Sequence, residues 1–430
     1  MATTFILARN GSAQIGTGSA AGFTSVDAAR QALSDGSVPA VTGALGFDTS
    51  GLAALTAPAE WAPAATAPPA RAPRPATAQT IAETTPEEHR DRVERALKVI
   101  DEGTVDKVVL ARTAELLLDG AVDPADLVSS FLHVGREATA FGVSLTPAGR
   151  DGHWLIGASP ELLIRKQGNV VTAHPYAGSA PRLADPDADA ATSRRLMESP
   201  KDRSEHAFVV NYLRTRLAPL CTELDAPAEP SLESTGELWH LATPIRGILA
   251  DDSVTALDLA ALLSPTPAVC GTPTAAAADL ISELEGPRDF YAGTVGWCDA
   301  NGDGEWLVSI RCPGTGRRPP HGHHVGRRRH RRRIGSGRRG GRDGHQVPHR
   351  PPRTGSGLTL TPTASPCRLP PAVKKWRPAA VRGQIAPGTP LLAISVRAAY
   401  RRRVSRAPDP GRGSGRRCLR DRRTGGPSSR

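Results

Sequence analysis

The sequence predicts an α/β (α+β) fold, with layered mixed or antiparallel sheets and helices, over residues 1–311. Helical and strand-like segments alternate in this part, and hairpin turns join several strands, which argues against a doubly wound parallel sheet. Residues 1–311 carry a net charge of −16, whereas residues 312–430 carry +27. We therefore predict one large domain over 1–311 and a disordered Arg/Pro/Gly-rich tail over 312–430.

Periodicity and capping residues predict the individual elements. Short apolar segments in residues 1–55 favour small strands, and the Pro/Ala-rich stretch 56–80 favours an exposed linker or long loop. Thr85 and Glu88 form a capping box that begins a helix, and an apolar strand follows from Lys107. The other predictions are strands at HWLIGA (153–158), ELLIRK (161–166), NVVTAH (169–174) and ATPIRGIL (242–249), helices over 193–217, 254–263 and 273–284, and a hairpin over 290–312.

Four polar residues stand where chemistry is possible. Lys107 begins an apolar strand, and Glu161 begins another strand directly after a Ser-Pro pair. Asp202 and Glu205 lie three residues apart on a predicted helix, a spacing that can place two carboxylates beside one cation. Each position also suits an ordinary solvent-exposed charge. Position alone therefore leaves both interpretations open.

Seven blocks follow one another along residues 105–312. They are VDKVVLARTAEL from Val105, GASPELLIRK from Gly157, AHPYAGSAPR from Ala173, ESPKDRSEHAFVV from Glu198, WHLATPIRG from Trp239, PTPAVCGTP from Pro265 and YAGTVGWCDANGDGEWLVSIRC from Tyr291. In this order they resemble the chorismate-utilising enzymes, a family that includes isochorismate synthase, salicylate synthase, anthranilate synthase component I and aminodeoxychorismate synthase. The versions DKVVLAR, HLATPIRG and GWCDANGDGEW are most similar to isochorismate synthases of siderophore pathways. The resemblance implies the chorismate-binding enzyme fold and an isomerase.

By this resemblance, Lys107 is the general base and Glu161 the general acid. In isochorismate synthesis water attacks C2 of chorismate while the C4 hydroxyl leaves, so a base and an acid are needed on opposite sides of the ring. Both groups would need pKa values shifted toward neutrality, and partial burial shifts a lysine down and a glutamate up. Anthranilate synthases carry Gln at the position of Lys107 and use ammonia. The lysine therefore favours water as the nucleophile.

The resemblance also implies groups that bind the substrate dianion. Family members hold the ring carboxylate with Mg²⁺, for which Glu205 is similar to a ligand and Asp202 is expected just behind it. Arg311 is similar to the residue that grips the enolpyruvyl carboxylate, and Tyr291 is expected to assist. His240, Gly178 and Gly271 match further substrate-binding positions, although a histidine such as His240 can equally be a packed core residue.

Cysteine usage and hydropathy suggest a compartment. The six cysteines show neither a CxxC pair nor a zinc spacing, and no apolar run approaches the length of a membrane span. We expect a reduced, cytoplasmic protein that acts as a monomer on chorismate, without a membrane partner.

The family ending is missing after Cys312. That ending continues with a strand, a GAGIV segment and a last helix carrying ETxxK, which supply amides, the remaining Mg²⁺ carboxylates and a lysine. Codon degeneracy permits this ending in a frame shifted by one nucleotide, in which residues 342–347 become Glu-Thr-Asp-Thr-Lys-Phe and residues 334–336 become Ser-Asp-Pro. We interpret the tail as an out-of-frame translation, which leaves the fold incomplete and the activity impaired.

The sequence is also compatible with other enzyme activities and with nucleic-acid binding. Salicylate synthase, or an anthranilate or aminodeoxychorismate synthase component I, shares the same blocks. From a different class, the basic tail could bind nucleic acid by neutralising phosphates, attached to a non-catalytic domain. Only Trp376 and Tyr400 in the tail could stack on bases, so nucleic acid is the less favoured partner.

Sequencing the gene across the Arg311 codon tests the shifted frame. We expect codons for GAGIV and ETxxK downstream of that codon, displaced by one nucleotide. If neither forward frame carries them, the tail is not a shifted form of the family ending.

Overall fold

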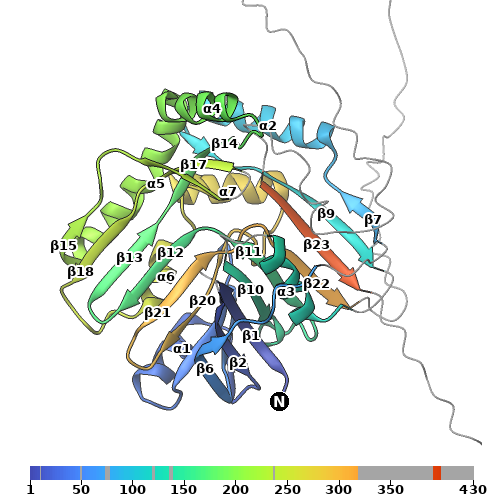
Figure 1. The fold of residues 1–430 in the computed structure, drawn as a ribbon, viewed down its shortest axis with the longest axis vertical. Coiled ribbons are helices and arrows are strands. Elements are labelled where there is room, and N and C mark those ends of the chain that lie inside the picture. The colour runs from blue at the N-terminus through green and yellow to red at the C-terminus, as the bar shows by residue number, and fades with distance from the viewer. Residues whose placement is uncertain are drawn as a thin grey trace, which may run out of the picture.

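The computed structural model describes residues 1–9, 11–48, 51–72, 78–118, 122–134, 139–235, 238–317 and 391–398. Among these residues, two nine-stranded sheets dominate the fold (Figure 1). The first sheet consists of β1 (Thr3–Arg9), β2 (Ser12–Thr17), β6 (Glu60–Thr66), β7 (Ala78–Glu83), β9 (Ala111–Leu118), β10 (Thr139–Ser144), β11 (Trp154–Ser159), β22 (Pro313–Arg317) and β23 (Leu391–Ala398), in the order β6-β2-β1-β10-β11-β22-β23-β9-β7.

The second sheet is antiparallel throughout, in the order β15-β18-β13-β12-β21-β20-β4-β5-β3. Its strands are β3 (Ala21–Phe23), β4 (Ala40–Leu45), β5 (Ala53–Ala57), β12 (Leu162–Gln167), β13 (Val170–His174), β15 (Cys221–Asp225), β18 (Ile245–Leu249), β20 (Thr294–Asp299) and β21 (Gly304–Val308). Two smaller sheets join β14 (Tyr176–Pro181) with β17 (Leu238–Ala242) and β16 (Ser231–Ser234), and β8 (Lys107–Val108) with β19 (Gly271–Thr272).

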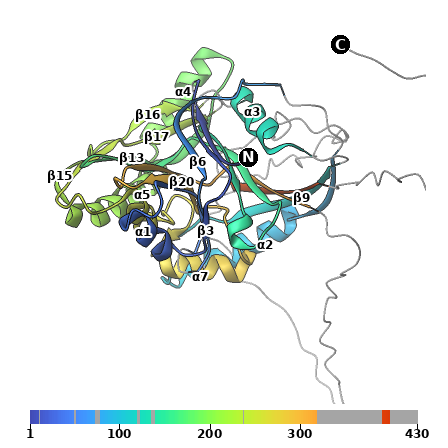
Figure 2. The same cartoon turned by 90° about the horizontal axis from the view of Figure 1, so that it is seen from below.

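Helices cover the outer faces of the sheets. Figure 2 shows α3 on one side of the first sheet and α2 with α7 on the other. The helices are α1 (Val26–Ser34), α2 (Pro86–Asp101), α3 (Pro124–Val134), α4 (Pro186–Glu198), α5 (Pro200–Leu217), α6 (Ala256–Leu263) and α7 (Thr274–Glu285), with 3-10 turns at Thr146–Ala148 and Ala218–Leu220. Within the described ranges, no helix combines the length and apolar character needed to cross a membrane.

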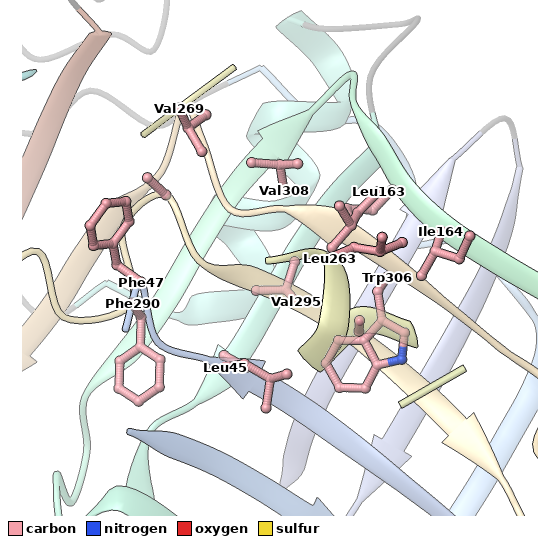
Figure 3. Close-up of a cluster of buried hydrophobic side chains, with 14 of the residues drawn as sticks. Leu45, Phe47, Leu163, Ile164, Leu263, Val269, Phe290, Val295, Trp306 and Val308 are labelled. Atoms are coloured by element: carbon pink, nitrogen blue, oxygen red, sulfur yellow. The ribbon is translucent and has the colours of Figure 1, made fainter. Parts of the chain in front are cut away.

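The main apolar core is built from residues of both large sheets and of α1, α5, α6 and α7. On β1, Phe5 and Leu7 face this core, whereas Ile6 and Ala8 face a second cluster under α3. A strand with both faces buried reads as a continuous apolar run, which explains TFILA in β1. On the second sheet, Trp306 and Ile164 pack beside α6 (Figure 3).

The α+β prediction with mixed and antiparallel sheets is confirmed. The described strands pair antiparallel except for β22 with β23 and β23 with β9, which are parallel. The predicted capping box is also present, because the Thr85 hydroxyl accepts from the Glu88 amide and the Glu88 carboxylate accepts from the Thr85 amide.

Three predicted segments were wrong. The single strand predicted from Lys107 is two strands, β8 and β9, which belong to different sheets. The stretch 56–80, predicted as a linker, contains β6, which pairs with β2 at the edge of the first sheet. An edge strand tolerates Pro63 because one side of its backbone needs no partner. The helix predicted over 193–217 is two helices, since Ser199 ends α4 and caps α5 and Pro200 disfavours helical backbone in the residue before it.

The predicted disordered tail lies mostly outside the described residues. The described parts of 312–430 beyond Cys312 are β22 and β23, both strands, and β23 fits between β22 and β9 (Figure 1). The chain therefore does continue with strand structure after residue 312.

The cysteines of the described ranges are all free thiols. Cys270, Cys298 and Cys312 are buried, and Cys221 is partly buried. Burial raises the pKa of each of the three buried thiols to about 12.

Packing of α5 against the core determines where its polar residues stand. Leu213 is 1% exposed and belongs to the main core. We expect Leu213→Ala to lower the free energy of unfolding by about 2–5 kcal/mol, because the cavity cannot fully collapse. Urea titration measures this loss. Leu262→Ala on α6, at a 42% exposed position, is the control and should change stability by less than about 0.5 kcal/mol; equal losses in the two variants would contradict the packing.

Candidate active site

Glu161 lies at the passage between the two large sheets. It follows β11 of the first sheet and precedes β12 of the second, and its side chain is 4% exposed. Its amide donates to the Ser159 hydroxyl at 3.2 Å, and its carbonyl accepts from the Val308 amide at 3.1 Å. The surrounding strands thus fix the Glu161 backbone and keep its side chain buried.

Lys107 reaches the same region from β8. This two-residue strand pairs with β19, where Lys107 stands opposite Thr272 and Val108 opposite Gly271. Burial lowers the pKa of the Lys107 ammonium, and the negative charges of Glu205 and Glu161 oppose the shift. The structure therefore brings these three predicted residues into one electrostatic neighbourhood.

The pKa of Glu161 moves in the opposite direction. Burial raises it to about 8, while Lys107, the Tyr176 backbone amide and Arg311 act against the increase. Burial thus favours the neutral form of both groups, the form in which a lysine can accept a proton and a glutamic acid can donate one. This is the pair of opposite shifts expected from the sequence.

Arg311 approaches Glu161 from the chain segment that follows the β20–β21 hairpin. Its backbone has φ of +52°, and its carbonyl accepts from the Ala158 amide at 3.4 Å. A Cβ on Gly157 would lie 2.8 Å from that carbonyl, so only glycine permits this close approach. The charge of Arg311 acts on both Glu161 and His240.

His240 is 5% exposed and has two hydroxyl neighbours. Its Nδ1 lies 2.8 Å from the Ser179 hydroxyl, and its Nε2 lies 2.7 Å from the Thr235 hydroxyl. Burial lowers its pKa to about 4, with Arg311 adding to the shift, so the ring is neutral at pH 7. One hydroxyl would have to give way before a substrate could bond to His240.

The two predicted glycines allow close approaches to Lys107 and Asp202. A Cβ on Gly271 would lie 2.2 Å from the Lys107 carbonyl, so no other residue fits there without moving β8. Gly178 has φ of +77°, and a Cβ there would lie 3.1 Å from the Asp202 Cβ. Both positions therefore demand glycine on geometric grounds.

The predicted Mg²⁺ ligands do not by themselves make a metal site. Glu205 is partly exposed, and its carboxylate lies 3.7 Å from the Lys201 ammonium. Asp202 lies one turn earlier on α5, facing Gly178. No group of three His, Cys, Asp or Glu in the described part of the chain could hold a metal. The residues present fit one end of such a site and leave it incomplete.

Tyr291 is the remaining predicted substrate-binding residue. It is 8% exposed and belongs to the main core, and the Arg288 guanidinium carbon lies 5.8 Å from its ring centre. Burial raises its pKa, with Arg288 opposing and Cys312 reinforcing the shift. Its buried hydroxyl has no hydrogen-bond partner among the described residues, which leaves a donor for another group.

Sequence reasoning missed two neighbours of the pair. His206 is buried next to Glu205, its Nε2 lies 2.7 Å from the Thr243 hydroxyl, and its pKa falls to about 4 through burial, with the Lys107 charge adding to the effect. Tyr176 contributes its backbone amide to Glu161. Sequence periodicity gives no sign that His206 is buried, and no sequence pattern marks a backbone amide.

Lys107 and Glu161 are buried and have pKa values shifted in opposite directions, an arrangement that suits acid–base chemistry. Residues 53–316 match the sequence model of the family described as chorismate binding enzyme. The chain therefore belongs to the chorismate-binding enzyme family.

Individual relatives sharpen the comparison. A Mycobacterium tuberculosis protein with the provisional name isochorismate synthase MenF is 45% identical over 295 residues, covering 67% of this chain and 79% of the relative. Isochorismate synthase DhbC of Bacillus subtilis is 40% identical, covering 66% and 74%. A crystal structure from Bacillus anthracis, provisionally described as the 2,3-dihydroxybenzoate-specific isochorismate synthase DhbC, is 32% identical with a TM-score of 0.66, covering 73% of this chain and 86% of that one.

The raised pKa of Glu161 predicts a pH-dependent stability difference. Between its ordinary value of 4.5 and about 8, folded Glu161 holds a proton that the unfolded chain has lost, so its contribution to stability falls as pH rises. Glu161→Gln removes this loss, and its stability relative to the parent should rise by up to about 1.4 kcal/mol per pH unit across the window. Urea titrations from about pH 5 to about pH 8 measure the difference. Parallel curves for parent and variant would show that Glu161 ionises freely when folded.

Proposed function

We propose that this chain has the architecture of an isochorismate synthase, which converts chorismate to isochorismate. The observation that carries the proposal is the buried Lys107–Glu161 pair with oppositely shifted pKa values. The similarity to isochorismate synthases of several organisms supports the choice of substrate and product.

In the reactive form both groups are neutral. Lys107 accepts a proton from the water that forms the new C–O bond at C2, the ring double bond shifts, and the C4–O bond breaks as Glu161 protonates the departing hydroxyl. One water is added and one is lost, so the reaction is an isomerisation. The lysine has then gained one proton and the glutamate has lost one, and proton exchange with solvent restores the pair.

In this proposal, groups around Lys107 and Glu161 bind the chorismate dianion. Arg311 is the proposed partner of the enolpyruvyl carboxylate, and its charge already acts on Glu161 and His240. The unpartnered hydroxyl of Tyr291, next to Cys312 in the core, supports its proposed role as a second donor. His240, Gly178 and Gly271 are the remaining proposed contacts.

The proposal includes Mg²⁺ dependence for a version of the chain that carries the family ending. A bound cation would neutralise the ring carboxylate of chorismate. Glu205 is the proposed ligand present here, with Asp202 behind it, and the other carboxylates belong to the ending recovered in the shifted frame. We therefore propose that the chain as written is impaired, although its acid and base are intact.

A cytoplasmic location is part of the same proposal. The four described cysteines are free thiols, which fits a reducing compartment.

Comparison of the chain as written with a frame-restored version tests the function. We expect the restored version to convert chorismate to isochorismate with Mg²⁺, and the chain as written to be slower by at least about 10²–10³, because several electrostatic partners are lost together. Lys107→Ala and Glu161→Gln in the restored version should each lower kcat by about 10²–10⁴. Chromatography of the products measures both effects.

The same assay separates the alternatives. Release of pyruvate with salicylate would identify a salicylate synthase, and a product formed only with ammonia would identify an aminating enzyme. Equal turnover by the written and restored chains would disprove the impairment.

A further inference from the structure

A buried ion pair lies at the end of α7, outside the catalytic groups. Glu285 is the last residue of α7, and Arg288 follows three residues later. Their side chains are 7% and 3% exposed, and the guanidinium donates to both carboxylate oxygens, with Nε–Oε2 and Nη2–Oε1 distances of 2.9 Å. The Arg288 guanidinium also lies over the Phe47 ring, with its carbon 4.8 Å from the ring centre.

The same two side chains also bind backbone groups on two other segments. Arg288 Nη2 donates to the Val109 carbonyl at 2.7 Å, and Nη1 donates to the Val269 carbonyl at 2.7 Å. Glu285 Oε1 accepts from the Ala111 amide. The pair thus joins the break between β8 and β9 to the turn that precedes β19.

These two segments carry Lys107 and Gly271. Strands β8 and β19 are only two residues long, and their flanking hydrogen bonds run from the Asp106 amide to the Thr272 carbonyl at 2.7 Å and from the Val109 amide to the Cys270 carbonyl at 2.9 Å. So short a ladder has little stability of its own. A rigid anchor on both strands is therefore needed to fix where the Lys107 backbone lies.

We propose that Arg288 and Glu285 are positioning residues for Lys107, which hold β8 and β19 in register from the end of α7. The proposal deepens the proposed function and rests on it for the importance of Lys107. A planar fork of donors suits this task, because one guanidinium binds two carbonyls and a carboxylate at fixed angles. A lysine at position 288 would keep the charge and lose that fork.

The test uses the full chain and needs no turnover. Arg288→Lys and Glu285→Gln are compared with Glu283→Gln, which removes the charge from an exposed ion pair between Arg95 and the same helix. The readouts are hydrogen exchange of the Asp106 and Val109 amides and the ¹³C signal of dimethylated Lys107, assigned by its loss in Lys107→Arg.

For Arg288→Lys we expect exchange of the two amides to accelerate by about tenfold or more and the Lys107 signal to shift or broaden, while amides of the β20–β21 hairpin keep their protection. Glu285→Gln should give a smaller effect in the same direction, because glutamine can still accept from the Ala111 amide. It also serves as the test if Arg288→Lys does not fold. Readouts in both variants that match Glu283→Gln, or a loss of protection spread evenly over the chain, would overturn the positioning role.

A kinetic measurement separates this proposal from the proposed function. In the frame-restored version, Arg288→Lys should lower kcat by about 10² with little change in KM, since misplacing a base affects the chemical step. If the restored parent shows no isochorismate synthase activity, the function fails while the Lys107 readout still decides the positioning role.

Discussion

Packing of the two large sheets against one apolar core is the constraint on which the site depends. The chain passes from β11 of the first sheet to β12 of the second through Glu161, so the carboxyl is buried where the layers meet. Burial raises the pKa of Glu161, and it lowers the pKa of Lys107 on β8. The opposite pKa shifts of Glu161 and Lys107 thus depend on how the chain packs around them.

Local signals in the sequence predicted much of the fold. The capping box at Thr85 and the hairpins of the second sheet depend on contacts between near neighbours, which a sequence displays directly. The β6 strand was missed because Pro63 argues against a strand. Only the complete sheet shows that β6 lies at an edge, where a proline is tolerated. The break at Ser199 was missed because Pro200, which marks it, also suits the first turn of a helix.

The candidate site was predictable only through family resemblance. Periodicity gave Lys107 and Glu161 no more weight than any charge at a strand start, since their burial arises from strands far apart in sequence. Such reasoning could not find the buried pair of Glu285 and Arg288, because its partners at Val109 and Val269 are backbone carbonyls. Nor could it foresee that Tyr291 packs beside Arg288 and Cys312 in the core.

The three buried thiols can report local opening of the core. Cys270 precedes β19, Cys298 lies in β20, and Cys312 ends the second sheet's hairpin region. With pKa values of about 12, these thiols carry almost no thiolate at neutral pH, and thiolate is the form that attacks a disulfide reagent. Each sulfur can react only after its surroundings open. The labelling rate of each cysteine, measured on its own peptide, would therefore report how often the protein opens locally at that cysteine.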